Sequence, residues 1–151
     1  GVGRAEAADL IKQYFGIYPG VQAYMQECVA EARSKGYAET LMGRRRYLRD
    51  LQSNNAAVRA FAERNAINAP IQGSAADLIK VAMIRLDQGL RNQSLQSKLL
   101  LQVHDELVLD QAPGEEAVLA DLVRREMTGA AQLLVPLVVD LGRGPDWLSA
   151  H

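Results

Sequence analysis

Two apolar runs meet at a pair of adjacent acids in residues 99–110, which read LLLQVHDELVLD. Apolar residues that alternate with other side chains are typical of strands, so we expect strands over 99–104 and 107–110, paired as an antiparallel hairpin. Leu99, Leu101 and Val103 should then share one face of the first strand. Asp105 and Glu106 would form the turn.

These two acids are an unusual choice for a hairpin turn. Two-residue turns favour Asn-Gly or Asp-Gly because they need positive φ, and adjacent carboxylates repel each other. Departures from local preference are concentrated at functional sites. One interpretation is a cation site in which Asp105 binds Mg²⁺, an ion that takes one or two carboxylates together with substrate phosphates. The other interpretation is a solvated acidic turn, because acids are common in turns.

Proline, glycine and asparagine residues divide the rest of the chain into predicted elements. In order, these are a helix over 4–15 that ends near Gly16; a helix from Pro19 to Gly36; two short extended pieces in 37–48 around Met42-Gly43; a helix from Asn54 or Asn55 to about Ile67; an interruption at Pro70; a helix from Gln72 to Gly89; the hairpin; a helix over 114–133; a strand over Leu137–Leu141; and a turn over 142–145. Because a doubly wound fold needs more strands, the prediction is α+β, with helices packed on a small antiparallel sheet.

Composition excludes several classes of protein. The apolar runs are far shorter than the roughly 20 residues of a membrane helix, so no membrane partner is expected. Cys28 is the single cysteine, which leaves no internal disulfide and fits a reducing cytoplasm. With one cysteine and two histidines, a structural zinc site is not expected either. The N-terminus lacks the apolar segment of a signal peptide.

Charge is divided unevenly along the chain. Residues 1–75 hold 10 Lys and Arg against 7 Asp and Glu, whereas residues 76–151 hold 7 against 11. A basic segment followed by an acidic one suits a protein that holds a polyanion and a cation together. A solvated charged surface is the alternative.

A second group of polar residues lies in the segment 63–77, ERNAINAPIQGSAAD. Arg64, Asn68 and Gln72 are separated by steps of four, which share one face of a helix, although a break at Pro70 would separate them. Guanidinium and amide donors suit the DNA minor groove, where every base pair offers acceptors. The alternative is a solvent-exposed surface, with Asn68 capping the next helix.

Four segments, taken in order, resemble the family A DNA polymerases of the bacterial DNA polymerase I type. They are GYAETLMGRRRYLRDL, ERNAINAPIQGSAADLIKVAM, LLLQVHDELVLD and the final VVDLGRGPDWLSAH. The tetrapeptide VHDE between apolar strands resembles motif C of that family. The resemblance covers essentially all 151 residues.

The resemblance implies a role for each matching residue. Asp105 would bind the catalytic metals, Glu106 would support the metal site, and His104 would help to position the primer strand. For His104, a partly buried strand histidine with a bonded imidazole is the alternative. Arg64, Asn68 and Gln72 would contact the DNA minor groove and backbone near the primer terminus. Residues 44–46 match a basic stretch at the fingers–palm boundary, and no contact is assigned to them.

The resemblance also implies a reaction and a domain plan. The reaction is template-directed nucleotidyl transfer from a deoxynucleotide to the 3′-hydroxyl of a primer on a primer–template DNA, at two Mg²⁺ ions. Residues 1–58 would be the end of the fingers, and residues 59–151 the part of the palm that carries motif C. The motif A aspartate, the fingers helix and the thumb would lie upstream of Gly1, so that the chain is catalytic only with that N-terminal portion.

Two other functions remain open. One is a non-catalytic fragment of the same fold that binds nucleic acid or has a structural role. The other is an unrelated Mg²⁺-dependent hydrolase that uses Asp105 and Glu106. For an isolated partial palm we expect dimerisation or aggregation, because sheet edges and apolar surface would be uncovered.

Overall fold

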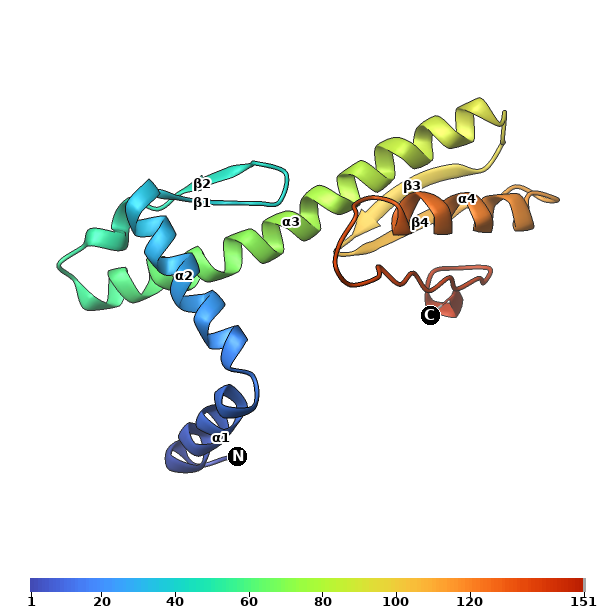
Figure 1. The fold of residues 1–151 in the computed structure, drawn as a ribbon. Helices are drawn as coiled ribbons and strands as arrows, with labels where there is room; N and C mark the ends of the chain where they lie inside the picture. The colour runs from blue at the N-terminus through green and yellow to red at the C-terminus, as the bar shows by residue number, and fades with distance from the viewer. Residues whose placement is uncertain (151) are drawn as a thin grey trace. The chain divides into compact units, whose positions relative to one another are not determined.

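The computed structural model of the protein describes residues 1–150, and its fold is α+β, as predicted (Figure 1). The chain forms two compact units, Gly1–Ser74 and the residues from Ala75 onward. The division falls inside the longest helix, α3 (Ala56–Asn92). The fingers–palm boundary at residue 58 stays a prediction.

The first unit is mainly helical. It contains α1 (Arg4–Ile17), α2 (Pro19–Lys35), β1 (Tyr37–Glu39), β2 (Arg45–Tyr47), the short 3-10 helix η1 (Arg49–Gln52) and the beginning of α3. Pro19 opens α2 as predicted, and Gly36 ends it with φ +80, a conformation that glycine adopts without strain. Asn55 begins α3, since its side-chain oxygen accepts a hydrogen bond from the backbone N–H of Ala57 at 2.9 Å.

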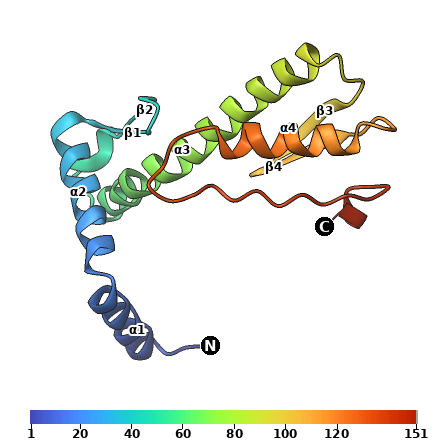
Figure 2. The ribbon, with the colours of Figure 1, turned by 45° about the vertical axis from the view of Figure 1, so that its right-hand side comes forward.

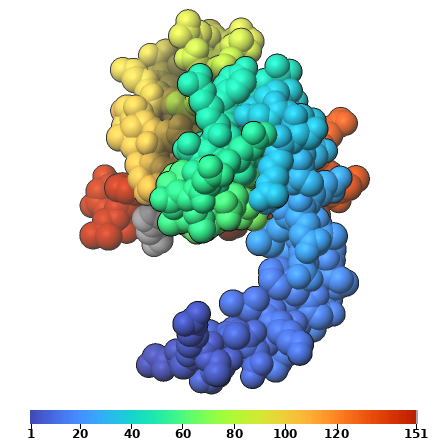
Figure 3. Space-filling view, turned by 90° about the vertical axis from the view of Figure 1, so that its left-hand side faces the viewer, coloured from blue at the N-terminus to red at the C-terminus, as the bar shows by residue number. Residues whose placement is uncertain are grey.

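The core of the first unit lies between α2, the β1–β2 pair and α3. Its buried residues are Ala32, Ala38, Leu48, Leu51, Ala62, Ala66 and Ala69. In contrast, α1 buries none of its residues, and Ile17 at its end is 70% exposed. Figure 3 shows α1, in dark blue, extending from α2 with its surface open. This helix therefore contributes no residue to the buried core of the unit.

The second unit packs two helices against a hairpin. It contains the remainder of α3, β3 (Lys98–Val103), β4 (Glu106–Asp110), α4 (Glu116–Thr128) and the 3-10 helix η2 (Leu148–Ala150). The core is formed by Leu86, Leu90, Leu119, Leu122 and Val123, with Leu95, Leu99, Leu107, Leu109 and Met127 packed against it. Figure 2 shows α4 alongside the hairpin. The helix is shorter at both ends than the predicted range 114–133.

The predicted break at Pro70 is wrong, because α3 continues through it without interruption. An interior proline costs a helix about 3 kcal/mol through the lost N–H and the crowded preceding turn. Burial of Ala66 and Ala69 in the core of the first unit helps to offset that cost. One turn later, the hydroxyl of Ser74 donates a hydrogen bond to the carbonyl of Pro70.

The hairpin turn lies one residue earlier than predicted. Val103 pairs with Glu106, so the two turn residues are His104 and Asp105, and Glu106 already belongs to β4. The prediction that Asp105 and Glu106 form the turn is therefore wrong. The strands 99–104 and 107–110 are confirmed apart from one or two residues at their ends.

The face assigned to β3 is also wrong, because the strand contains a bulge. Leu99 pairs with Leu109 and Leu101 pairs with Val108, which leaves Leu100 without a partner. An extra residue of this kind shifts the alternation of side chains by one. Leu99 therefore packs in the core, whereas Leu101 lies on the opposite face and is exposed.

The predicted last strand does not form within the described residues. Residues 137–141 have no strand assignment, and both sheets have two strands, β1–β2 and β3–β4. Val138 is 80% exposed. A strand needs a neighbouring strand to satisfy its backbone hydrogen bonds. The segment has the composition of a strand, but no strand among the described residues pairs with it.

The chain exposes more surface than two compact bodies of the same total mass. The accessible surface is 10889 Å². Two separate compact bodies, each of half the mass, would together expose only about 9,100 Å² by the usual scaling of area with mass. Within residues 1–150, no helix has the length and apolar character needed to cross a membrane.

Candidate nucleic-acid interface and metal site

Arg64, Asn68 and Gln72 share one face of α3, since the helix does not break at Pro70. All three side chains are exposed. At 100° per residue, they lie on the side of the helix away from the buried Ala66 and Ala69. The structure therefore brings together the three residues that the sequence placed only provisionally on one surface.

The polar groups of this face are available to a ligand. Among residues 1–150, no hydrogen bond engages the side-chain amides of Asn68 and Gln72. The guanidinium of Arg64 lies 5.8 Å from the centre of the Phe61 ring. This arrangement presents two amides and one cation along about two turns of a single helix, a spacing that follows a groove or a backbone.

His104 occupies a strained position at the hairpin tip. Its φ is +54, and within residues 1–150 the only other non-glycine residue with positive φ is Ser94. A turn with positive φ at its first position favours glycine there, and another residue costs about 1–3 kcal/mol. The side-chain N–H of Gln102 donates to the carbonyl of His104 at 2.7 Å, which helps to hold the turn. The local misfit therefore lies at His104 rather than at Glu106.

The two acids differ in environment. Asp105 is exposed at the second turn position, and Glu106 is partly buried at the start of β4. Their carboxylate oxygens are the ligand type that Mg²⁺ prefers, and Mg²⁺ needs only one or two of them. Within residues 1–150, no group of three His, Cys, Asp or Glu residues is arranged to hold a metal ion. Asp105 and Glu106 therefore offer suitable donor atoms for Mg²⁺, but the described residues do not form a metal site of three such ligands.

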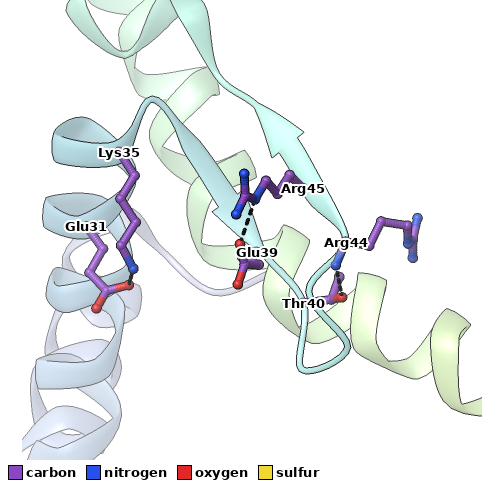
Figure 4. Close-up of polar contacts among 6 residues, drawn as sticks. All are labelled: Glu31, Lys35, Glu39, Thr40, Arg44 and Arg45. Carbon is purple, nitrogen blue, oxygen red and sulfur yellow. Dashed lines mark hydrogen bonds and ion pairs between the residues drawn. The ribbon is translucent and has the colours of Figure 1, made fainter.

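The basic stretch 44–46 is partly engaged in contacts within the first unit (Figure 4). Arg45 forms an ion pair with Glu39 at 2.9 Å and lies over the ring of Tyr37. The contact with Glu39 raises the pKa of Arg45 above its ordinary value. Arg44 donates to the carbonyl of Gly73 at 2.9 Å. Two of the three arginines thus have structural partners.

The sequence did not predict that the β1–β2 turn contacts α3. Ser74 is 7% exposed and accepts a hydrogen bond from the backbone N–H of Leu41 at 2.9 Å. The signal was present in the small pair Gly73-Ser74 directly after Gln72, which permits the turn to approach closely. Its partner, 33 residues earlier, was not recognisable from the local pattern.

Comparison with known proteins gives the class of this chain. The family model described as DNA polymerase family A matches residues 1–149. The chain therefore belongs to DNA polymerase family A. This confirms the resemblance seen in the motifs and rules out the unrelated hydrolase.

The similar proteins are bacterial DNA polymerases I. The chain is 56% identical over 148 residues to DNA polymerase I of Geobacillus stearothermophilus, covering 97% of this chain and 17% of that protein. It is 52% identical over 145 residues to DNA polymerase I of Mycobacterium bovis, covering 96% and 16%. The chain thus spans about one sixth of the length of the relatives it matches.

A solved structure has the same fold. It is the POL domain of Pol1 from M. smegmatis in complex with DNA primer-template and dNTP. The TM-score is 0.96 at 50% sequence identity, over 99% of this chain and 26% of that one. The fold of the described residues is therefore that of a part of a polymerase domain.

Proposed function

We propose that the chain is part of a bacterial, cytoplasmic DNA-directed DNA polymerase that acts in DNA replication and repair. The proposal rests on the position of Asp105, which is exposed at the tip of a hairpin. The chain around it matches the polymerase family over 149 residues. Residues 1–58 would belong to the fingers, and residues 59–151 to the palm. The relatives are about six times as long, so the reaction would require the remaining polypeptide.

The exposed face of α3 would bind the primer–template duplex. Asn68 and Gln72 offer amide donors, and the minor groove offers a purine N3 or pyrimidine O2 acceptor at every base pair. These contacts are nearly independent of sequence, as a polymerase requires. Arg64 would add a cation for the DNA backbone or groove. The relative from M. smegmatis was solved in complex with DNA primer-template and dNTP, which supports DNA as a partner of this chain.

The hairpin tip would serve the chemical step. Asp105 and Glu106 would hold Mg²⁺ together with a carboxylate from the remaining polypeptide. When bound, the ions would supply charge stabilisation and a lower pKa for the primer hydroxyl. His104 would position the primer strand, because its strained φ fixes the direction of the turn. In the reaction, the primer 3′-oxygen bonds to the α-phosphate of the dNTP and pyrophosphate leaves.

A hybrid polymerase tests this function. The matching 148 residues of the G. stearothermophilus relative would be replaced by this chain, and primer extension with Mg²⁺ and four dNTPs would be measured. We expect extension, and its loss in Asp105→Asn. Asp110→Asn is the matched control, since Asp110 is also an exposed acid but lies at the far end of β4.

Two results would contradict the proposal. One is full extension by the Asp105→Asn hybrid. The other is a hybrid that folds and binds duplex DNA but never extends a primer, which would favour a non-catalytic, nucleic-acid-binding fragment.

A further inference from the structure

Asn68 and Gln72 stand on either side of Pro70, so their relative direction depends on how α3 passes this residue. A proline inside a helix removes one backbone hydrogen bond and commonly produces a kink. A kink here would tilt Gln72 away from the line through Arg64 and Asn68. Some other contact must therefore fix the turn of α3 that follows Pro70.

The β1–β2 turn, residues 40–44, makes that contact. The N–H of Leu41 donates to Ser74 Oγ at 2.9 Å, and the same hydroxyl donates to the carbonyl of Pro70. Arg44 Nη2 donates to the carbonyl of Gly73 at 2.9 Å. One buried hydroxyl thus joins the β1–β2 turn to the helix at the position of the proline.

Gly73 permits this approach. A Cβ atom at residue 73 would lie 2.5 Å from Thr40 Cγ2, which is closer than such atoms come in practice. The side chain of Thr40 is itself fixed within the β1–β2 turn, because its Oγ1 accepts a hydrogen bond from the backbone N–H of Arg44 at 3.1 Å. The turn and the helix therefore fit together only while residue 73 has no side chain.

From these contacts we propose that Ser74 and Gly73 are positioning residues for duplex binding, because they fix Gln72 relative to Asn68 and Arg64 through the β1–β2 turn. The inference rests on the proposed role of the α3 face in binding DNA. Neither residue needs to touch DNA. At 100° per residue, both lie on the side of α3 that faces the core and the turn, away from Asn68 and Gln72.

The test is a double-mutant cycle on duplex affinity, with fluorescence anisotropy of a labelled primer–template and the hybrid polymerase described above. Ser74→Ala should raise the Kd about 5-fold, whereas Ser74→Thr, which keeps the hydroxyl, should stay within about 2-fold. In a Gln72→Ala background, Ser74→Ala should lose its effect because it acts through Gln72. A merely structural role would give the same increase in both backgrounds and would overturn the proposal.

Gly73→Ala tests the positioning role by a second route. Alanine is the better helix former by about 1 kcal/mol, which offsets part of the cost of displacing the β1–β2 turn, so the variant should remain folded, and a thermal melt checks this. Its Kd should nevertheless rise about 5-fold, and Thr40→Ser, which removes the colliding methyl group, should restore it. An unchanged Kd in Gly73→Ala would overturn the proposal even if Ser74→Ala failed to fold.

The outcomes also separate this inference from the proposed function. If Asn68→Ala and Gln72→Ala leave the Kd unchanged, or if the hybrid polymerase binds no duplex, the assignment of the α3 face is wrong, and so is the positioning role that rests on it. If those variants weaken binding while Ser74→Ala and Gly73→Ala do not, only the positioning role is wrong.

Discussion

Ser97 and Glu115, 18 residues apart, are joined by two hydrogen bonds: the hydroxyl of Ser97 donates to Glu115 Oε2 at 2.6 Å, and its backbone N–H donates to the same oxygen at 2.9 Å. The N–H of Gln96 donates to Oε1 at 2.8 Å. These contacts tie the chain just before β3 to the start of α4. The hydrogen bonds, chiefly that of the Ser97 hydroxyl, lower the pKa of the Glu115 carboxyl.

The lowered pKa predicts a pH dependence of stability. A carboxyl whose pKa is lower in the folded state stabilises that state above its unfolded pKa, and this contribution disappears as the pH falls through the folded pKa. Glu115→Gln should therefore lower the melting temperature at pH 7 and have a much smaller effect near pH 3. Circular dichroism melts between pH 3 and 7 measure this. Asp121→Asn, at an exposed acid of α4, is the control, and equal effects of Glu115→Gln at both pH values would contradict the prediction.

The strained backbone at His104 predicts that a glycine there would raise stability and lower activity. His104→Gly should stabilise the chain by about 1 kcal/mol, because glycine adopts positive φ at no steric cost. The same change should reduce primer extension by the hybrid polymerase at least about 10-fold, since the turn that presents Asp105 loses its fixed direction.

The second residue with positive φ provides the control for that prediction. Ser94 has φ +55, lies in the loop before β3 and is exposed. Ser94→Gly should give a similar gain in stability and leave extension unchanged. If both variants reduced extension alike, the effect would come from general flexibility and not from the hairpin tip.

The core of the second unit predicts a large effect for one leucine. Leu86 is fully buried among residues of α3 and α4. Leu86→Ala should lower the free energy of unfolding by about 3 kcal/mol, through lost burial and the cavity left behind. Urea denaturation measures this value. Ile84→Ala, on an exposed position of the same helix, should cost less than about 1 kcal/mol, and a similar loss in both variants would contradict the packing described here.

The exposed apolar surface predicts self-association of the isolated chain. Val138 lies in the extended segment after α4 and is largely exposed. Val138→Lys should raise the dissociation constant of self-association about 10-fold, because about 1.5 kcal/mol from the burial of one valine side chain is lost. Gln132→Lys, which adds the same charge at an exposed polar position, should have little effect. Sedimentation velocity over a range of concentrations measures this. A single monomeric species at all concentrations would show that the exposed apolar surface does not mediate self-association.

Much of the fold was predictable because its signals are local. Pro19 and Gly36 mark the ends of α2, and Asn55 caps α3, by interactions that span only a few residues. The hairpin followed from its alternating apolar residues. Within it, the turn position and the bulge at Leu100 were not predictable, because register is set by pairing across the strands and by packing on Leu119 and Leu122.

The candidate site shows the same limit. The steps of four identified Arg64, Asn68 and Gln72, but the proline between them made a shared face uncertain from sequence. The contact that settles it, from Leu41 to Ser74, joins residues 33 positions apart. In the same way, residues 137–141 have the composition of a strand, but a strand also needs a neighbour, and composition does not show whether one is present.

The large exposed area of the chain has a calorimetric consequence. The heat capacity of unfolding reflects apolar area that becomes hydrated when the chain unfolds, and typically amounts to about 12–15 cal/mol/K per residue. Surfaces such as those of α1 and Val138 are already hydrated in the folded chain. The isolated chain should therefore show a heat-capacity increment per residue below this range, and the increment should rise once a partner covers those surfaces.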